Sequence, residues 1–180
     1  MSYMPLEIAD YIIAALVALD DLADVKVFVR GVIPPATLGQ ELYPYTEVFV
    51  SRETQDANMP RLTGNVHGRV YNGLITFSTL STTVAGGDWN EINDERTIEV
   101  PSFDYAVQLA ALALAEMGKC EHASLGDLSV TVNDATEVVT QFYPDNGVIY
   151  GLDRAARVNN WENFASLEFT VHTHRTITES

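Results

Sequence analysis

Residues 66–80 read VHGRVYNGLITFSTL and carry the strongest local signal in the chain. Aromatic and β-branched residues fill both halves of this stretch, and such residues are typical of strands. Asn72-Gly73 separates the two halves, and this dipeptide tolerates the positive φ values that a two-residue hairpin turn requires. The sequence therefore predicts a long β-hairpin that turns at Asn72-Gly73.

Upstream of this hairpin, the sequence pattern changes from helix to strand. Apolar residues recur at helical spacing after Pro5, which is a common first helical residue, and they predict a helix over about residues 5–22. Alternating residues then predict a strand over residues 25–32, and aromatic and β-branched residues predict a second strand over residues 45–51. A polar loop is expected over residues 52–61.

Downstream, Ser102 can cap a second helix, and the alanine-rich run behind it ends at Gly118-Lys119. A helix is expected over about residues 102–117. Three strands are then predicted, over residues 128–132, 136–142 and 164–177. A turn is expected at residues 144–147, and residues 148–158 are ambiguous. A length of 180 residues favours a single domain over residues 1–180.

The charge balance is strongly acidic. The chain has 25 acidic and 10 basic residues, a net charge of −15 and a pI near 4.4. Such a surface repels phosphate, which argues against binding to nucleic acid or to an anionic membrane. Lys26 and Lys119 are the only lysines, a balance that resembles proteins of salt-adapted archaea, although many other acidic proteins share part of it.

No catalytic signature stands out in the sequence. The chain has one cysteine, Cys120, so neither an intramolecular disulfide nor a cysteine-based zinc ribbon is expected. A phosphate-binding loop, a nucleophile elbow and an HExxH helix are all absent. His172 and His174 share one strand face, but a third metal ligand is missing, and His67 or His122 could join them only through a contact made by the fold.

We therefore expect no enzyme activity and no catalytic, cofactor-binding or metal-binding residues. The longest apolar run, residues 11–19, is too short to span a membrane. Acidic residues precede it, which is the wrong charge for a signal peptide.

The order of these predicted elements resembles the tail terminator (tail completion) proteins of long-tailed, siphovirus-like phages and haloarchaeal tailed viruses. The resemblance rests on the amphipathic opening helix and on three further stretches: residues 43–50 (YPYTEVFV), 68–75 (GRVYNGLI) and 160–173 (NWENFASLEFTVHT). It implies an α+β fold in which a mostly antiparallel sheet with a long β-hairpin is flanked by the N-terminal helix and the second, central helix.

The resemblance also implies a virion structural protein that forms a homohexameric ring at the head–tail junction. Such a ring caps the completed tail tube, joins it to the head-side connector or stopper protein, and lets genomic DNA pass without specific binding. Its location is the tail or neck of the virion, after assembly in the host cytoplasm. Residues 85–99 and 136–158 look long for a minimal member, which leaves a head–tail adaptor or stopper open. A small metal- or ligand-binding enzyme is a weaker alternative.

Two groups of residues are candidates for contacts in such a ring. The acidic loop at residues 85–99 is the candidate lining of the lumen, through Asp88, Glu91, Asp94 and Glu95. A solvated outer loop is the alternative for this segment. The predicted hairpin is the candidate arm between subunits, through Arg69, Tyr71, Asn72 and Gly73.

Overall fold

A six-stranded sheet and two helices make up the protein in the computed structural model, which describes residues 3–33, 39–56, 65–80, 90–91, 98–99, 101–153 and 162–177. The strand order is β1-β2-β3-β8-β7-β6, and β1–β2 is the one parallel pair among them. A separate two-stranded sheet pairs β4 with β5. These features confirm the α+β class with a mostly antiparallel sheet, an N-terminal helix and a central helix.

The helices are α1 (Met4–Val17) and α2 (Pro101–Met117). The strands are β1 (Val27–Arg30), β2 (Tyr45–Gln55), β3 (Val66–Leu80), β4 (Asn90–Glu91), β5 (Ile98–Glu99), β6 (Ser129–Val132), β7 (Ala135–Asp153) and β8 (Glu162–Ile177). Short 3-10 helices are η1 (Asp20–Leu22), η3 (Gln40–Leu42) and η4 (Cys120–His122).

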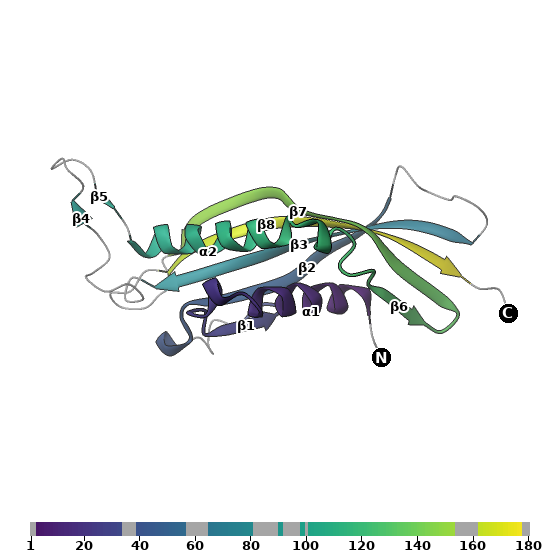
Figure 1. The fold of residues 1–180 in the computed structure, drawn as a ribbon, viewed down its shortest axis with the longest axis horizontal. Coiled ribbons are helices and arrows are strands. Elements are labelled where there is room, and N and C mark those ends of the chain that lie inside the picture. Colours follow the sequence, from purple (N-terminus) through teal and green to yellow (C-terminus); the bar gives the residue numbers. More distant parts are fainter. Residues whose placement is uncertain are drawn as a thin grey trace.

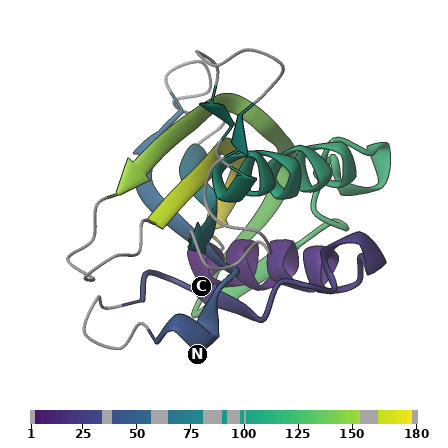
Figure 2. The ribbon, with the colours of Figure 1, turned by 90° about the vertical axis from the view of Figure 1, so that its left-hand side faces the viewer.

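Both helices lie against the same face of the curled sheet (Figures 1 and 2). They run in opposite directions, so that α1 begins at one end of the molecule and α2 begins at the other (Figure 1). We call these the Met4 end and the Pro101 end. The first helix is shorter than expected, because Leu19 takes an extended conformation and residues 20–22 form η1 instead.

The core lies between the helices and this face of the sheet. Alternate residues of the two central strands point toward the helices, and each of them is at most 2% exposed: Tyr71, Ile75, Phe77, Ala165, Leu167, Phe169 and Val171. Ile8, Ile12 and Leu16 meet them from α1 at a spacing of four residues, which keeps one helix face buried. Small residues of α2 in the same core, Ala106, Ala110 and Ala113, let that helix approach closely.

The predicted turn at Asn72-Gly73 is wrong, because β3 continues through both residues. Gly73 pairs with Phe169 of β8, and a Cβ atom at Gly73 would lie 2.2 Å from the ring of Phe169. The Asn72 side chain accepts a hydrogen bond of 3.0 Å from the hydroxyl of Thr170. The glycine therefore makes room for an aromatic ring.

The long antiparallel pairs of the sheet are β2–β3, connected by residues 56–65, β7–β8, connected by residues 154–161, and β3–β8, whose strands are far apart in the chain.

Two other predicted breaks also lie inside strands. The expected loop after residue 51 is still strand as far as Gln55, with a bulge between Val50 and Arg52. The expected turn at residues 144–147 is a second irregularity within β7, where the register shifts between Tyr143 and Gly147. The turn-forming residues that begin with Pro144 therefore mark an irregularity within a strand, where an unpaired backbone group is tolerated.

Candidate functional site

Most of the acidic segment lies outside the described residues. Asp88, Asp94 and Glu95 belong to that undescribed part, and Glu91 is described only as backbone in β4, paired with Ile98 of β5. The β4–β5 pair lies beyond the first turn of α2, at the Pro101 end (Figure 1). The assignment of this segment to the lumen of a ring stays a prediction.

The residues of the predicted arm lie within the sheet. Tyr71 is 2% exposed and faces the helices, and Gly73 is packed under Phe169. Arg69 forms an ion pair with Glu53 of the neighbouring strand β2. These four residues do not form a protruding turn, and a contact between subunits through them stays a prediction.

The paired histidines of β8 project from the face of the sheet that the helices leave open. His172 Nδ1 lies 3.0 Å from Asp56 Oδ2, and the ring of Tyr143 meets the imidazole edge-on at 5.7 Å. His67 pairs with Arg175, next to His174, so its side chain points to the opposite face of the sheet. Among the described residues, the group with the geometry to hold a metal ion includes His122 instead.

A row of exposed apolar side chains runs along the outer strand β7. Val138, Tyr143 and Ile149 pair with even-numbered residues of β8, so all three lie on the sheet face away from the helices. Their exposed fractions are 37%, 43% and 42%. We call these three residues the β7 row. The sequence predicted the first part of this strand, residues 136–142, and left residues 148–158 ambiguous, although the β-forming run Val-Ile-Tyr at residues 148–150 is a signal for its continuation.

Beside Tyr143 and Ile149 of this row, the outer edge of β7 has no partner strand among the described residues. β6 pairs only with the first part of β7, and Phe142 N–H donates to the carbonyl of Ala123. From residue 143 onward, no described strand lies along this edge. Unpaired strand edges present a line of backbone donors and acceptors that a second strand can use.

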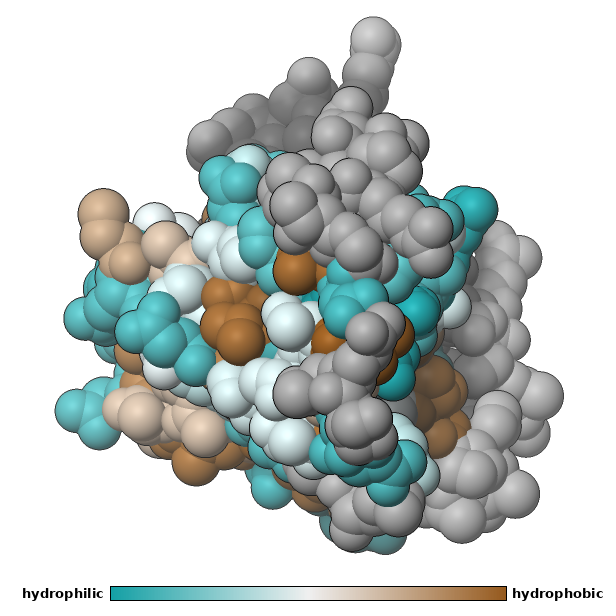
Figure 3. Space-filling view, turned by 90° about the vertical axis from the view of Figure 1, so that its right-hand side faces the viewer, coloured by the Kyte–Doolittle hydropathy of each residue, from teal (hydrophilic) through white to brown (hydrophobic). Residues whose placement is uncertain are grey.

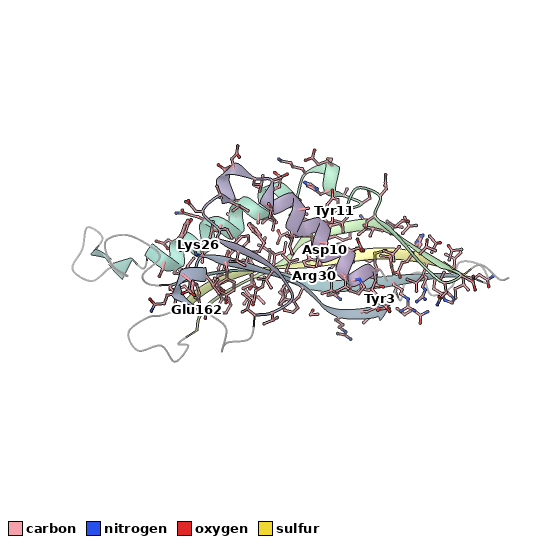
Figure 4. All side chains as sticks on the ribbon, turned by 90° about the horizontal axis from the view of Figure 1, so that it is seen from below. Tyr3, Asp10, Tyr11, Lys26, Arg30 and Glu162 are labelled. Atoms are coloured by element: carbon pink, nitrogen blue, oxygen red, sulfur yellow. The ribbon has the colours of Figure 1, made fainter. Side chains whose placement is uncertain are left out.

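The other lateral side of the sheet ends at β1. Val32, just after this strand, is 60% exposed. Asp10 of α1 and Arg30 of β1 form an ion pair of 2.6 Å, and Figure 4 shows these two side chains close together. The sheet therefore has two different lateral sides, and each of them exposes apolar residues.

A pocket of about 500 Å³ lies at the Met4 end. Its walls are mostly apolar, and they come from the start of α1, β6 and the ends of the long strands: Tyr3, Met4, Pro5, Leu6, Glu53, Tyr71, Val130, Val132, Ala135, Glu137 and Arg175. Tyr3 and Leu6 are 49% and 39% exposed. Figure 3 faces this end of the molecule and shows apolar surface near the centre of the view, between polar side chains.

Two buried carboxylates lie toward the Pro101 end. Glu47 accepts a hydrogen bond of 2.6 Å from the backbone N–H of Ile33, and Glu162 accepts one of 2.8 Å from the hydroxyl of Tyr45. Both glutamates are 8% exposed. Burial raises the pKa of Glu47, the hydrogen bond from Ile33 opposes this increase, and the nearby charge of Glu162 adds to it.

The raised pKa of Glu47 predicts a loss of stability as the pH rises. A glutamate whose folded-state pKa lies above its ordinary value of 4.5 stabilises the fold below that value, and this contribution is lost as the pH rises through the folded-state pKa. Glu47→Gln keeps an acceptor for Ile33 and removes the charge. At pH 7, we expect the free energy of unfolding of this variant to exceed that of the wild type by on the order of 1 kcal/mol, which corresponds to about 2–4 °C in Tm. At pH 4, we expect the two proteins to be equally stable.

Thermal unfolding of both proteins between pH 4 and pH 8 measures this effect. Glu41→Gln, at an exposed position on η3, is the matched control and should follow the wild-type curve. The prediction is contradicted if the curves of Glu47→Gln and the wild type stay parallel over the whole range.

No protein-family model matches the chain, and no curated protein matches it significantly. Neither helix in the described ranges combines the length and the hydropathy that crossing a membrane requires.

Proposed function

We propose that this chain is a structural subunit of a ring at the head–tail junction of a tailed virus particle. The ring caps the completed tail tube, joins it to the head-side connector, and lets genomic DNA pass. The observation that carries this proposal is the open edge of β7 with the exposed β7 row beside it. A sheet with an open, partly apolar edge suits a protein that is completed by its neighbours.

The contact between neighbours joins two different surfaces. The β7 row of one subunit meets the β1 side of the next, where Val32 is exposed. A contact between unlike surfaces is heterologous, and repeated copies of it close into a ring when the rotation allows. Six copies are proposed, as in the family that the sequence resembles.

The charge of the subunit suits passage of DNA. A net charge of −15 per chain repels the phosphate backbone, so DNA forms no lasting contact with the lumen. The two ends of the subunit offer different structures to the neighbours along the tail axis, because the Met4 end holds the apolar pocket and the Pro101 end carries the β4–β5 pair (Figure 1). The tail tube and the connector are the proposed partners at these ends.

Sedimentation velocity of the purified chain tests the ring. We expect a species of six times the 19.8 kDa subunit mass in 1 M salt, which reduces the screening length to about 3 Å and so weakens repulsion between acidic subunits. Ile149→Asp places a charge in the β7 row and should give monomers. Ile177→Asp is the matched control, since Ile177 is 41% exposed against 42% for Ile149, and it should leave the ring intact.

A second variant tests whether the contact joins unlike surfaces. Val32→Asp should also give monomers, because it damages the opposite side of the same contact. An equimolar mixture of Ile149→Asp and Val32→Asp retains one intact pair of surfaces and should give dimers. A wild-type monomer at every salt concentration, or a ring that survives Ile149→Asp, would contradict the proposed assembly.

The position in the particle requires a cryo-EM map of the intact neck. A ring seated on the tail tube supports the terminator role. A ring seated against the portal, away from the tube, supports the head–tail adaptor instead.

A further inference from the structure

The end of α2 and the 3-10 helix η4 bring one histidine and two carboxylates together. Glu116 lies in the last turn of α2, and Glu121 and His122 belong to η4. One ligand atom from each residue lies within 4.8 Å of the other two. His122 Nε2 is 3.1 Å from Oε1 of Glu116 and 3.5 Å from Oε1 of Glu121.

These separations fit a shared metal ion. Zinc binds nitrogen and oxygen ligands at about 2.0–2.2 Å, so two ligands of one ion lie about 3.0–3.5 Å apart, depending on the angle between the bonds. Both distances from His122 Nε2 fall in that range. An ion could therefore bind all three atoms after small side-chain rotations.

The imidazole is held in the orientation that such an ion needs. The hydroxyl of Tyr11 lies 3.0 Å from Nδ1 of His122, and the two rings meet edge-on at 5.8 Å. Tyr11 is itself packed against Gly126, whose φ of +66° favours glycine and where a Cβ would lie 3.1 Å from the tyrosine ring. A partner on one ring nitrogen that directs the other toward the metal is the usual arrangement around metal-binding histidines.

The charges also suit a divalent cation. Two carboxylates and a neutral imidazole balance a charge of +2, and Lys119 pairs with Oε2 of Glu116, which leaves Oε1 turned toward His122. An imidazole ligand favours zinc and its transition-metal neighbours, whereas calcium and magnesium prefer oxygen ligands alone. His122 is 7% exposed, so the nitrogen ligand is largely shielded from water.

We propose that Glu116, Glu121 and His122 bind one Zn²⁺ ion, with Tyr11 as a positioning residue and water completing the coordination. The imidazole stays neutral when the ion binds, with its proton on Nδ1 and donated to the Tyr11 hydroxyl. When the ion binds, an imidazolium releases its Nε2 proton to solvent, whereas a neutral imidazole protonated on Nε2 loses that proton to water and takes one up on Nδ1, with no net change in protons. The ion joins the end of α2 to η4, and the site is independent of the proposed ring.

Titration of the metal-free full chain with Zn²⁺, followed by calorimetry, tests the site. We expect one ion per chain, and we expect Co²⁺ to bind with a visible absorption band that Zn²⁺ abolishes. Glu121→Gln should weaken binding at least tenfold, and because Glu121 is 66% exposed this change leaves the fold intact. Tyr11→Phe should weaken Zn²⁺ binding by about 10–100-fold through loss of the ring orientation.

Three controls separate this site from other ligands. Cys120→Ser, which removes the single thiol, His174→Ala and Glu41→Gln should all leave zinc affinity unchanged, and excess Mg²⁺ or Ca²⁺ should not displace Zn²⁺. The proposal is overturned if no ion binds, if binding survives both Glu121→Gln and His122→Gln, or if it depends on Cys120. Displacement of Zn²⁺ by Ca²⁺ would likewise overturn it.

Discussion

Gly73→Ala is expected to cost about 3 kcal/mol of folding free energy, or about 6–12 °C in Tm. The added methyl group would lie 2.2 Å from the ring of Phe169 and 2.5 Å from the backbone oxygen of Phe49. Phe169 is fully buried and Phe49 O belongs to strand β2, so neither atom can move without disturbing the core or the sheet. Thermal or denaturant unfolding measures the loss.

Gly147→Ala is the matched control for this prediction. It is the same substitution in another strand, but the nearest atom, at 2.7 Å, is the carboxylate oxygen of the Glu168 side chain, which can rotate away. We expect a change within about 1 kcal/mol, because the restriction of the unfolded chain partly offsets the contact.

A double variant identifies the ring as the cause. Phe169→Leu removes the ring atoms nearest to Gly73, so Gly73→Ala should cost less in the Phe169→Leu protein than in the wild type. We expect the difference to exceed 0.5 kcal/mol, the usual limit for independent sites. Additive costs would contradict the packing explanation for this glycine.

The second large effect is expected at Glu137, a buried carboxylate in β7. Its Oε1 accepts a hydrogen bond of 2.8 Å from the hydroxyl of Tyr71 and another from Thr173. Tyr71 and Thr173 are 2% and 1% exposed. Burial, followed by the charge of Glu137, raises the pKa of Tyr71, so this hydroxyl remains a donor at all ordinary pH values.

Glu137→Leu removes the acceptor from both hydroxyls at once. Buried donors without an acceptor cost about 1–3 kcal/mol each, so we expect a loss of about 2–5 kcal/mol and a fall of roughly 5–15 °C in Tm. Glu137→Gln keeps an oxygen at the same place and should lose less than half as much. Equal losses in the two variants would show that the charge, and not the acceptor, is what these hydroxyls require.

The elements with a strong period were predictable from the sequence. Ile8, Ile12 and Leu16 fixed the buried face of α1, and alternation from residue 164 onward identified β8, because apolar spacing reflects which face is buried. Asn72-Gly73 is compatible with two structures, a tight turn and a strand in which the glycine lies under an aromatic ring, and its local sequence favours the turn. Only the pairing of Gly73 with Phe169, nearly a hundred residues later in the chain, distinguishes these two structures.

The candidate sites were less predictable than the fold. The β7 row depends on a strand that continues through Pro144, and the open edge beside Tyr143 and Ile149 depends on β6 being short. His122, Glu116 and Glu121 are close in sequence, but the contact with Tyr11 joins residues 111 positions apart. Neither the composition nor the spacing of residues along the chain predicts contacts between residues so far apart in sequence.

The position of β8 in the sheet determines when, during synthesis of the chain, the sheet can fold. β8 comes after all other described elements in the chain, yet it lies between β3 and β7 in the middle of the sheet. Until residues 162–177 have been synthesised, Ile75 and Phe77 of β3 lack their neighbouring strand, and β3 and β7 present unpaired edges. The sheet therefore closes only after translation has passed this strand, and a ribosome stalled before it would present an aggregation-prone nascent chain to chaperones.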